Sequence, residues 1–182
     1  MGTEAVTRFD DAGAAVHRLT RWCDDFPAPG IRFADLTPVF ADADGFAAVI
    51  DALTEAAGGA DLVAGVDARG FLLGSGMALR LNTGVLAVRK AGKLPPPVHS
   101  RSYKLEYGSA QLEIPADGVD LRGRRVVVVD DVLATGGTLV AAADLLTDAG
   151  ADVVALAVVL ELAELDGRSR VGRYPLTSLV QV

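Results

Sequence analysis

The chain has 182 residues, enough for one domain with a hydrophobic core, and 51% of them are hydrophobic, which excludes a disordered chain. Its net charge of −7 argues against non-specific nucleic-acid binding, because phosphate backbones are bound by clustered Lys and Arg. With the single Cys23, no signal-peptide pattern and no apolar run of about 18 residues, we expect a soluble cytoplasmic protein that binds neither nucleic acid nor membrane.

The first third of the sequence predicts two helices separated by a turn. Apolar side chains at helical spacing indicate an amphipathic helix over roughly 8–24, which the proline- and glycine-containing stretch 27–30 ends. A short extended piece is expected at 31–33. A second helix includes residues 46–53, with Asp44 as its expected N-cap.

Four short apolar runs follow, and they predict strands that are buried on both faces. Their branched residues do not alternate with polar ones, as is typical of parallel sheets. The runs are 62–66, 85–88, 126–129 and 153–160. Helices are expected between most of them, over 70–81 and over 138–149, the latter closed by Gly150. This alternation predicts a single α/β domain with a mostly parallel, twisted sheet that helices flank.

Charged residues follow the predicted strands, in blocks at 67–69, 89–93, 130–138 and at Glu161. Open α/β sheets bind ligands at the carboxyl ends of their strands, so these blocks are expected to converge on one crevice. The proline- and glycine-rich stretch between residues 90 and 114 interrupts the alternation. Long loops in compact domains are commonly functional, and we interpret this one as a mobile lid or hairpin rather than a passive surface loop.

The most informative motif is VVVVDDVLATGGT at 126–138. A buried strand delivers two adjacent acids, and a turn of small residues then opens a helix, whose N-terminus binds anions. The motif has neither the Gly-Lys-Ser/Thr of a P-loop nor the GxGxxG of a dinucleotide fingerprint. Two carboxylates would repel a polyphosphate but suit a sugar diol, and this reading is favoured over one in which they cap the next turn. The motif therefore predicts a site for ribose 5-phosphate.

This motif resembles the phosphoribosyl-pyrophosphate motif of type I phosphoribosyltransferases, and three other stretches resemble the adenine phosphoribosyltransferase family in particular. Residues 26–38 resemble its base-binding segment, 65–71 its pyrophosphate loop and 88–108 its flexible catalytic loop. The resemblance covers nearly the whole chain. It implies the fold of that family, with an N-terminal helix and base-binding hood over about 1–40 and a lid over about 91–108. It also implies the reaction of purine salvage that makes AMP and pyrophosphate from adenine and phosphoribosyl pyrophosphate.

The resemblance also assigns roles to individual residues. The 5′-phosphate would lie against Ala134, Thr135, Gly136, Gly137 and Thr138, and the ribose hydroxyls against Asp130 and Asp131. Pyrophosphate would be held by Asp67, Ala68, Arg69, Arg89 and Lys93, with a cis peptide bond between Asp67 and Ala68. Adenine would stack on Phe33 with Leu162 opposite, and the backbone of Arg32 and Ala34 would read its edge.

Catalysis would then require charge neutralisation, exclusion of water and management of the purine proton. Arg69 is a candidate for the first of these, together with Mg²⁺. The sequence has no His/Cys cluster, so Mg²⁺ is expected to arrive on the substrate rather than in a protein site. Glu106 is the candidate general acid/base, although it could also be a solvated loop carboxylate, and Tyr107 would orient the reacting groups.

Two alternatives remain at this point. The chain could be a phosphoribosyltransferase for hypoxanthine, xanthine or orotate, although Glu161-Leu162 stands where oxopurine relatives typically carry a lysine. It could also be a non-catalytic sensor of phosphoribosyl pyrophosphate, although no DNA-binding extension is evident. The resemblance further implies a homodimer, with Arg89 and Lys90 near the partner's site.

Overall fold

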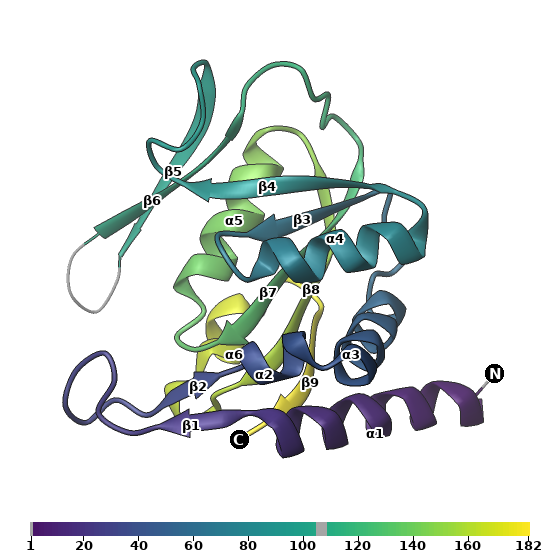
Figure 1. The fold of residues 1–182 in the computed structure, drawn as a ribbon. Helices are drawn as coiled ribbons and strands as arrows, with labels where there is room; N and C mark the ends of the chain where they lie inside the picture. The colour runs from purple at the N-terminus through teal and green to yellow at the C-terminus, as the bar shows by residue number, and fades with distance from the viewer. Residues whose placement is uncertain (1, 105–108) are drawn as a thin grey trace.

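The computed structural model describes residues 2–104 and 109–182, with side chains described from residue 8 onward (Figure 1). Seven strands form one sheet in the order β5-β6-β4-β3-β7-β8-β9. They are β3 (Leu62–Val66), β4 (Gly84–Lys90), β5 (Val98–Lys104), β6 (Ser109–Pro115), β7 (Arg125–Leu133), β8 (Asp152–Glu161) and β9 (Leu176–Gln181). The neighbours among β4, β3, β7, β8 and β9 are parallel, while β5 and β6 form an antiparallel hairpin at one edge. The predicted α/β fold is thus confirmed.

Helices cover both faces of the sheet. On one face lie α1 (Gly2–Leu19), α3 (Ala43–Glu55) and α4 (Gly70–Leu81), and on the other lies α5 (Gly137–Asp148) (Figure 1). The short helices are α2 (Thr37–Ala41), the 3₁₀ turn η1 (Ala163–Leu165) and α6 (Gly167–Val171). Among the described residues, no helix is both long and apolar enough to cross a membrane.

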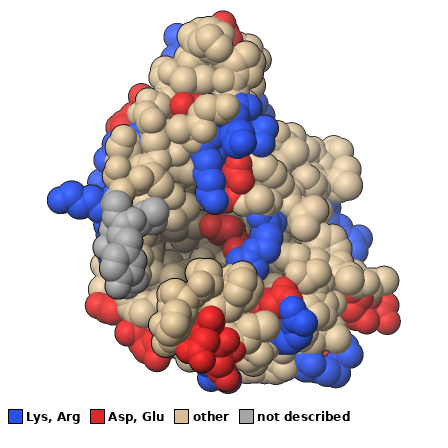
Figure 2. Space-filling model, turned by 60° about the vertical axis from the view of Figure 1, so that its left-hand side comes forward, with Lys and Arg blue, Asp and Glu red and all other residues tan. Residues whose placement is uncertain are grey.

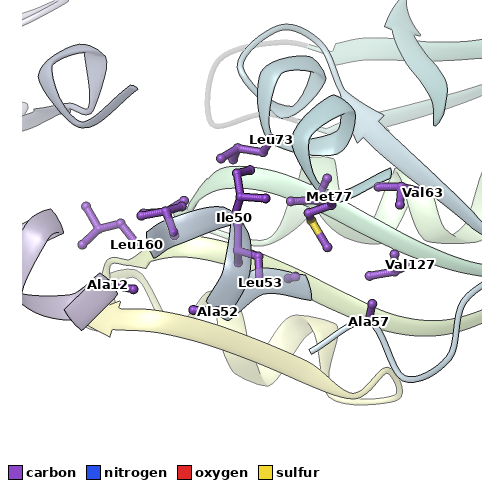
Figure 3. Close-up of a cluster of buried hydrophobic side chains, with 14 of the residues drawn as sticks. Ala12, Ile50, Ala52, Leu53, Ala57, Val63, Leu73, Met77, Val127 and Leu160 are labelled. Carbon is purple, nitrogen blue, oxygen red and sulfur yellow. The ribbon is translucent and has the colours of Figure 1, made fainter. Parts of the chain in front are cut away.

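The branched run of β7 explains why the sheet can be covered on both faces. Val127 and Val129 belong to the core cluster beneath α3 and α4, whereas Val126 and Val128 belong to the cluster beneath α5. Successive residues of a strand point to opposite faces, and helices cover both faces here. All four side chains are therefore fully buried. Figure 3 shows the first cluster, in which Ile50, Leu53, Leu73 and Met77 of the helices meet Val63 and Val127 of the sheet.

Two glycines bring α4 unusually close to the sheet. A Cβ atom on Gly65 would lie 2.4 Å from the carbonyl oxygen of Gly70, and a Cβ atom on Gly70 would lie 2.6 Å from that of Val129. Only residues without a side chain permit this contact. The contact holds the turn between β3 and α4, residues 67–69, against the end of β7.

Several predicted boundaries were wrong at the N-terminal end. The first helix ends at Leu19 rather than near 24, and residues 21–23 form β1 (Arg21–Cys23), which pairs with β2 (Phe33–Asp35). Helical periodicity did not reveal that the proline-rich turn folds this segment back onto residues 33–35. The N-cap of α3 is Asp42, whose side chain accepts a hydrogen bond from the backbone N–H of Gly45, and not Asp44.

We expect Gly65→Ala to lower the free energy of unfolding by about 2–3 kcal/mol, because the added methyl group must displace backbone atoms of α4. Gly84→Ala is the matched control in the neighbouring strand, where a Cβ atom would meet only Leu62 at an ordinary 3.4 Å. Urea unfolding of both variants measures the difference. Equal stabilities of the two variants would contradict the close approach of α4.

Candidate active site

The candidate active site lies where β3, β7 and β8 end, on the side of the sheet from which the β1–β2 hairpin also projects (Figure 1). Figure 2 looks toward this side and shows a hollow with acidic side chains at its floor and Lys or Arg side chains beside it. Two neighbouring cavities are found here, one small and one large.

The small cavity, of about 80 Å³, lies at the N-terminus of α5. It is lined by Asp130, Val132, Leu133, Ala134, Thr135, Gly136, Gly137, Thr138 and Leu139. Gly136 is the N-cap, with φ of 77°, and no side chain caps the helix. The first backbone N–H groups of a helix have no intrahelical acceptors, so they offer donors and a partial positive charge to an anion. All five residues predicted to bind the 5′-phosphate therefore line one cavity of phosphate-group size.

The large cavity, of about 490 Å³, is formed between the hairpin and the end of the sheet. Its lining is Gly30, Ile31, Arg32, Phe33, Ala34, Arg69, Asp131, Val132, Ala134, Leu162, Glu164 and Leu165. The four residues predicted to contact adenine, namely Arg32, Phe33, Ala34 and Leu162, are all among them. A ring system entering this cavity would meet both aromatic and aliphatic surface, as is typical of ligand sites.

The β1–β2 hairpin places Phe33 and turns the side chain of Arg32 aside. Phe33 pairs with Cys23 across the hairpin, and the ring of Phe26 meets its ring edge-on at 5.1 Å between centroids. The guanidinium of Arg32 lies over the ring of Trp22, 4.4 Å from its centroid. The predicted contact between the backbone of Arg32 and adenine stays a prediction.

The two acids of the motif lie inside β7 and join the two cavities. Asp130 lines the small cavity and Asp131 the large one, where it is 5% exposed. The backbone N–H of Asp131 donates a hydrogen bond of 2.8 Å to Oδ1 of Asp130. β7 continues past the two acids to Leu133, and α5 has no side-chain cap, so neither acid caps the helix that follows.

The environment of the two acids disfavours their negative charge. Burial raises the pKa of Asp130 well above 3.8, and the neighbouring carboxylate of Asp131 raises it further. Burial also raises the pKa of Asp131, while the guanidinium of Arg69 opposes this shift. Nε of Arg69 lies 2.7 Å from Oδ2 of Asp131, so the two groups form an ion pair. The Nε–H bond is not directed at Oδ2, so the pair makes no hydrogen bond. Oδ2 thus has no hydrogen-bond partner among the described residues, and a ligand hydroxyl could provide one.

The turn between β3 and α4 supplies the cationic side of the site. The peptide bond between Asp67 and Ala68 is cis, as predicted. Arg69 lines the large cavity, and its guanidinium lies 5.4 Å from the ring centroid of Phe33. Oδ2 of Asp67 faces Nε of Arg89 at 3.6 Å, and Nη1 of Arg89 donates to the carbonyl of Lys93 at 3.4 Å. Of the five residues predicted to bind pyrophosphate, Asp67, Arg89 and the backbone of Lys93 are in contact, while Ala68 and Arg69 follow Asp67 in the same turn.

Two predicted catalytic residues, Glu106 and Tyr107, lie outside the described residues. The prediction that Glu161 joins the crevice was wrong, because its side chain is buried and ion-paired with Arg168. The hydrogen bonds from Arg168 lower the pKa of Glu161 below 4.5. A charged residue after a strand can satisfy its charge within the fold, and the sequence alone does not distinguish the two cases.

Sequence reasoning also missed several residues of the site. Val132 and the turn residues Glu164 and Leu165 line the large cavity, and Oγ1 of Thr138 donates to the hydroxyl oxygen of Tyr103 at 3.3 Å. The position of Val132, two residues after Asp130 in the same strand, was the available signal for its orientation. No local sequence pattern indicated Tyr103, Glu164 or Leu165, because β5 and the turn after β8 reach the site only through tertiary packing.

Comparisons with known proteins agree with this geometry. Residues 33–178 match the family model described as phosphoribosyl transferase domain. The adenine phosphoribosyltransferase of Nocardia farcinica is 70% identical over 175 residues, which cover 96% of this chain and 92% of that protein. The crystal structure of adenine phosphoribosyltransferase from Thermoanaerobacter pseudethanolicus has a TM-score of 0.88 at 45% identity, covering 93% of this chain and 99% of that one.

A third relative was solved with ligands. The adenine phosphoribosyltransferase of Saccharomyces cerevisiae, in complex with an imino-altritol bisphosphate and adenine, has a TM-score of 0.87 at 36% identity. The match covers 94% of this chain and 99% of that chain. A phosphorylated sugar analogue and a purine base are thus bound together on this fold in a relative.

We expect Asp130→Asn to raise the free energy of unfolding at pH 7 by about 1 kcal/mol. The variant has no ionisable carboxyl group to bury, and replacing a functional residue of this kind commonly stabilises a protein while its activity is lost. A carboxyl group whose pKa is raised by folding retains its proton where the unfolded chain has lost it. The native protein therefore loses stability as the pH rises from about 3.8 through the raised pKa.

Urea unfolding of the ligand-free protein between pH 5 and pH 8 measures this difference. The advantage of the variant should shrink as the pH falls, because Asp130 in the native protein then regains its proton. A variant that is less stable than the native protein at pH 7 would contradict the assignment of a destabilising charge.

Proposed function

The chain belongs to the adenine phosphoribosyltransferase family, and we propose that it converts adenine and phosphoribosyl pyrophosphate into AMP and pyrophosphate in purine salvage. The observation that carries this proposal is the pair of cavities joined by Asp130 and Asp131. The small cavity at the helix start matches a phosphate, and the larger cavity with aromatic and aliphatic walls matches a base. The two acids between the cavities match the diol of the ribose that joins phosphate and base.

The ribose phosphate would be held by the end of β7 and the start of α5. Backbone N–H groups at the helix start and the hydroxyls of Thr135 and Thr138 would bind the 5′-phosphate. The two ribose hydroxyls would donate to Asp130 and Asp131. Oδ2 of Asp131 has no hydrogen-bond partner among the residues described. This exchange would relieve part of the unfavourable burial of the acids.

Adenine would occupy the large cavity between Phe33 and Leu162. Residues 32–34 line this cavity, and their backbone groups would read the amine and ring nitrogens of the base. The relatives at 61–70% identity all carry the adenine activity in their names, which disfavours an oxopurine or orotate substrate and a purely regulatory role.

In the reaction, a purine nitrogen attacks the anomeric carbon of the ribose, the bond to pyrophosphate breaks, and pyrophosphate leaves with the electron pair. Arg69 would balance this charge; its guanidinium lies 5.4 Å from the ring centroid of Phe33, and its Nε lies 2.7 Å from Oδ2 of Asp131. Lys93 and Arg89 would assist from the end of β4. Glu106 stays the predicted acceptor of the purine proton, with Tyr107 orienting the groups.

Mg²⁺ is proposed to be held by the pyrophosphate and ribose hydroxyls of the substrate. Among residues 8–104 and 109–182, no group of three or more His, Cys, Asp or Glu side chains could hold a metal ion. The two adjacent acids would accept hydrogen bonds from the hydroxyls that carry the ion. Their carboxylate oxygens are also of the kind that hard cations prefer, so the site suits a ligand that arrives with Mg²⁺. When bound, Mg²⁺ would neutralise charge on the departing pyrophosphate.

A pyrophosphate-release assay with adenine, guanine, hypoxanthine and orotate tests the proposal. We expect turnover with adenine and at least about 100-fold less with each of the others, because unpaired polar groups at the base edge reject them. The variant Asp130→Asn with Asp131→Asn is the control, and we expect it to lose at least about 100-fold in kcat/KM for phosphoribosyl pyrophosphate. Turnover with another base, or full activity of the double variant, would refute the base or the diol assignment respectively.

We further propose that the chain acts in the cytoplasm as a homodimer, joined through α4 and β4. Three large apolar side chains are exposed on these elements: Leu72 by 52%, Leu79 by 84% and Val85 by 46%. Such a cluster suits the apolar centre of an interface. Arg89 and Lys90, at the end of the same strand, would then approach the partner.

We expect Leu79→Glu to weaken the dimer by at least about tenfold, because the charge must be buried in the interface. Val182→Glu is the control and should stay dimeric. Val182 is 45% exposed and directly follows β9, at the opposite edge of the sheet from the β5–β6 hairpin. Sedimentation equilibrium measures both. A native protein that is monomeric at all concentrations, or two variants with the same dissociation constant, would contradict this interface.

A further inference from the structure

The turn after β8, residues 162–167, lines the large cavity at its start and packs at its end against the loop that lines the small cavity. At its start, Leu162 and then Glu164 and Leu165 line the large cavity. At its end, Gly167 packs against the phosphate-binding loop, since a Cβ atom on Gly167 would lie 2.1 Å from the carbonyl oxygen of Ala134. A Cβ atom on Gly136 would in turn lie 2.7 Å from the carbonyl oxygen of Gly167. The two backbones are therefore in contact without side chains between them.

The two residues that flank this turn are joined by an ion pair between a buried carboxylate and a half-exposed guanidinium. Glu161 is 2% exposed, and Nε of Arg168 donates to its Oε1 at 2.9 Å while Nη2 of Arg168 donates to its Oε2. Ser178 of β9 completes the group, because its hydroxyl donates to Oε2 at 2.7 Å and accepts from Nη2 of Arg168 at 2.9 Å. The planar fork of arginine fixes both the separation and the relative orientation of the two ends of the turn.

The first end of the turn is also fixed to β7. The backbone N–H of Leu162 donates to the carbonyl oxygen of Leu133 at 2.9 Å, so Leu162 cannot move without the strand that carries the two acids. Neither Glu161 nor Arg168 lines a cavity, so neither side chain is placed to touch a bound nucleotide. An ion pair with one partner exposed to solvent contributes little net stability, whereas its geometry can fix one arrangement of the chain.

We propose that Arg168 is a positioning residue, which through Glu161 sets the spacing between the adenine-contacting wall at Leu162 and the phosphate-binding loop at Gly136. The inference rests on the proposed function. Its consequence concerns ligands that span both cavities. AMP must satisfy the base wall and the phosphate loop at once, whereas ribose 5-phosphate occupies only the loop and the acids. Loss of the spacing should therefore weaken AMP more than ribose 5-phosphate.

The test measures the dissociation constants of AMP and ribose 5-phosphate by calorimetry for the native protein and Arg168→Lys, which keeps the charge but loses the fork. We expect AMP to bind about tenfold more weakly to the variant, with ribose 5-phosphate changed by less than about threefold, because misplacement affects only the doubly held ligand. Arg173→Lys is the matched control, since Arg173 pairs with the buried Asp144 on α5, away from both cavities. It should leave the ratio of the two constants unchanged.

A second variant, Glu161→Gln with Arg168→Gln, removes both charges and should show the same selective loss of AMP; if it does not fold, Arg168→Lys decides. An unchanged ratio in Arg168→Lys would overturn the inference, and so would an equal loss of both ligands, which indicates general loosening of the loop. The same selective loss in Arg173→Lys would overturn it as well. A native protein that does not prefer AMP to ribose 5-phosphate would instead refute the proposed function, so the two failures are distinguishable.

Discussion

The buried pair of acids at the end of β7 is the constraint around which the site is arranged. Asp130 and Asp131 follow four buried valines in the same strand, and burial raises the pKa of both carboxyl groups. One guanidinium, that of Arg69, faces Asp131 without a hydrogen bond. The fold therefore holds two carboxylates that are incompletely solvated and incompletely paired, and hydroxyl donors from a sugar would complete their environment.

The surrounding elements reach these acids because side chains are missing where backbones meet. Gly65 and Gly70 bring the turn at 67–69 against β7, and Gly167 brings the turn after β8 against the phosphate-binding loop. Parallel strands end at one edge of the sheet, so both turns and the start of α5 arrive at the same side. The close contacts then determine how far apart the small cavity, the two acids and the large cavity lie.

The sequence predicted the parts of this arrangement that depend on local chemistry. The branched runs predicted β3, β7 and β8, and the motif at 126–138 predicted the strand, turn and helix start that line the small cavity, because neighbouring residues encode these features. The end of α1 was misplaced because Arg21–Cys23 depends on pairing with residues 33–35. Glu161 was misjudged for the same reason, since its partner Arg168 meets it only when the turn closes.

The contrast between Asp131 and Glu161 shows how one fold uses buried carboxylates in two ways. Both side chains face arginine, yet burial dominates at Asp131 and raises its pKa, whereas hydrogen bonds from Arg168 and Ser178 dominate at Glu161 and lower its pKa. A carboxylate whose acceptors are already used holds its surroundings in place, and one with a free acceptor can take a ligand. At these two acids, the degree of hydrogen-bond satisfaction therefore distinguishes the proposed ligand-binding role of Asp131 from the proposed positioning role of Glu161.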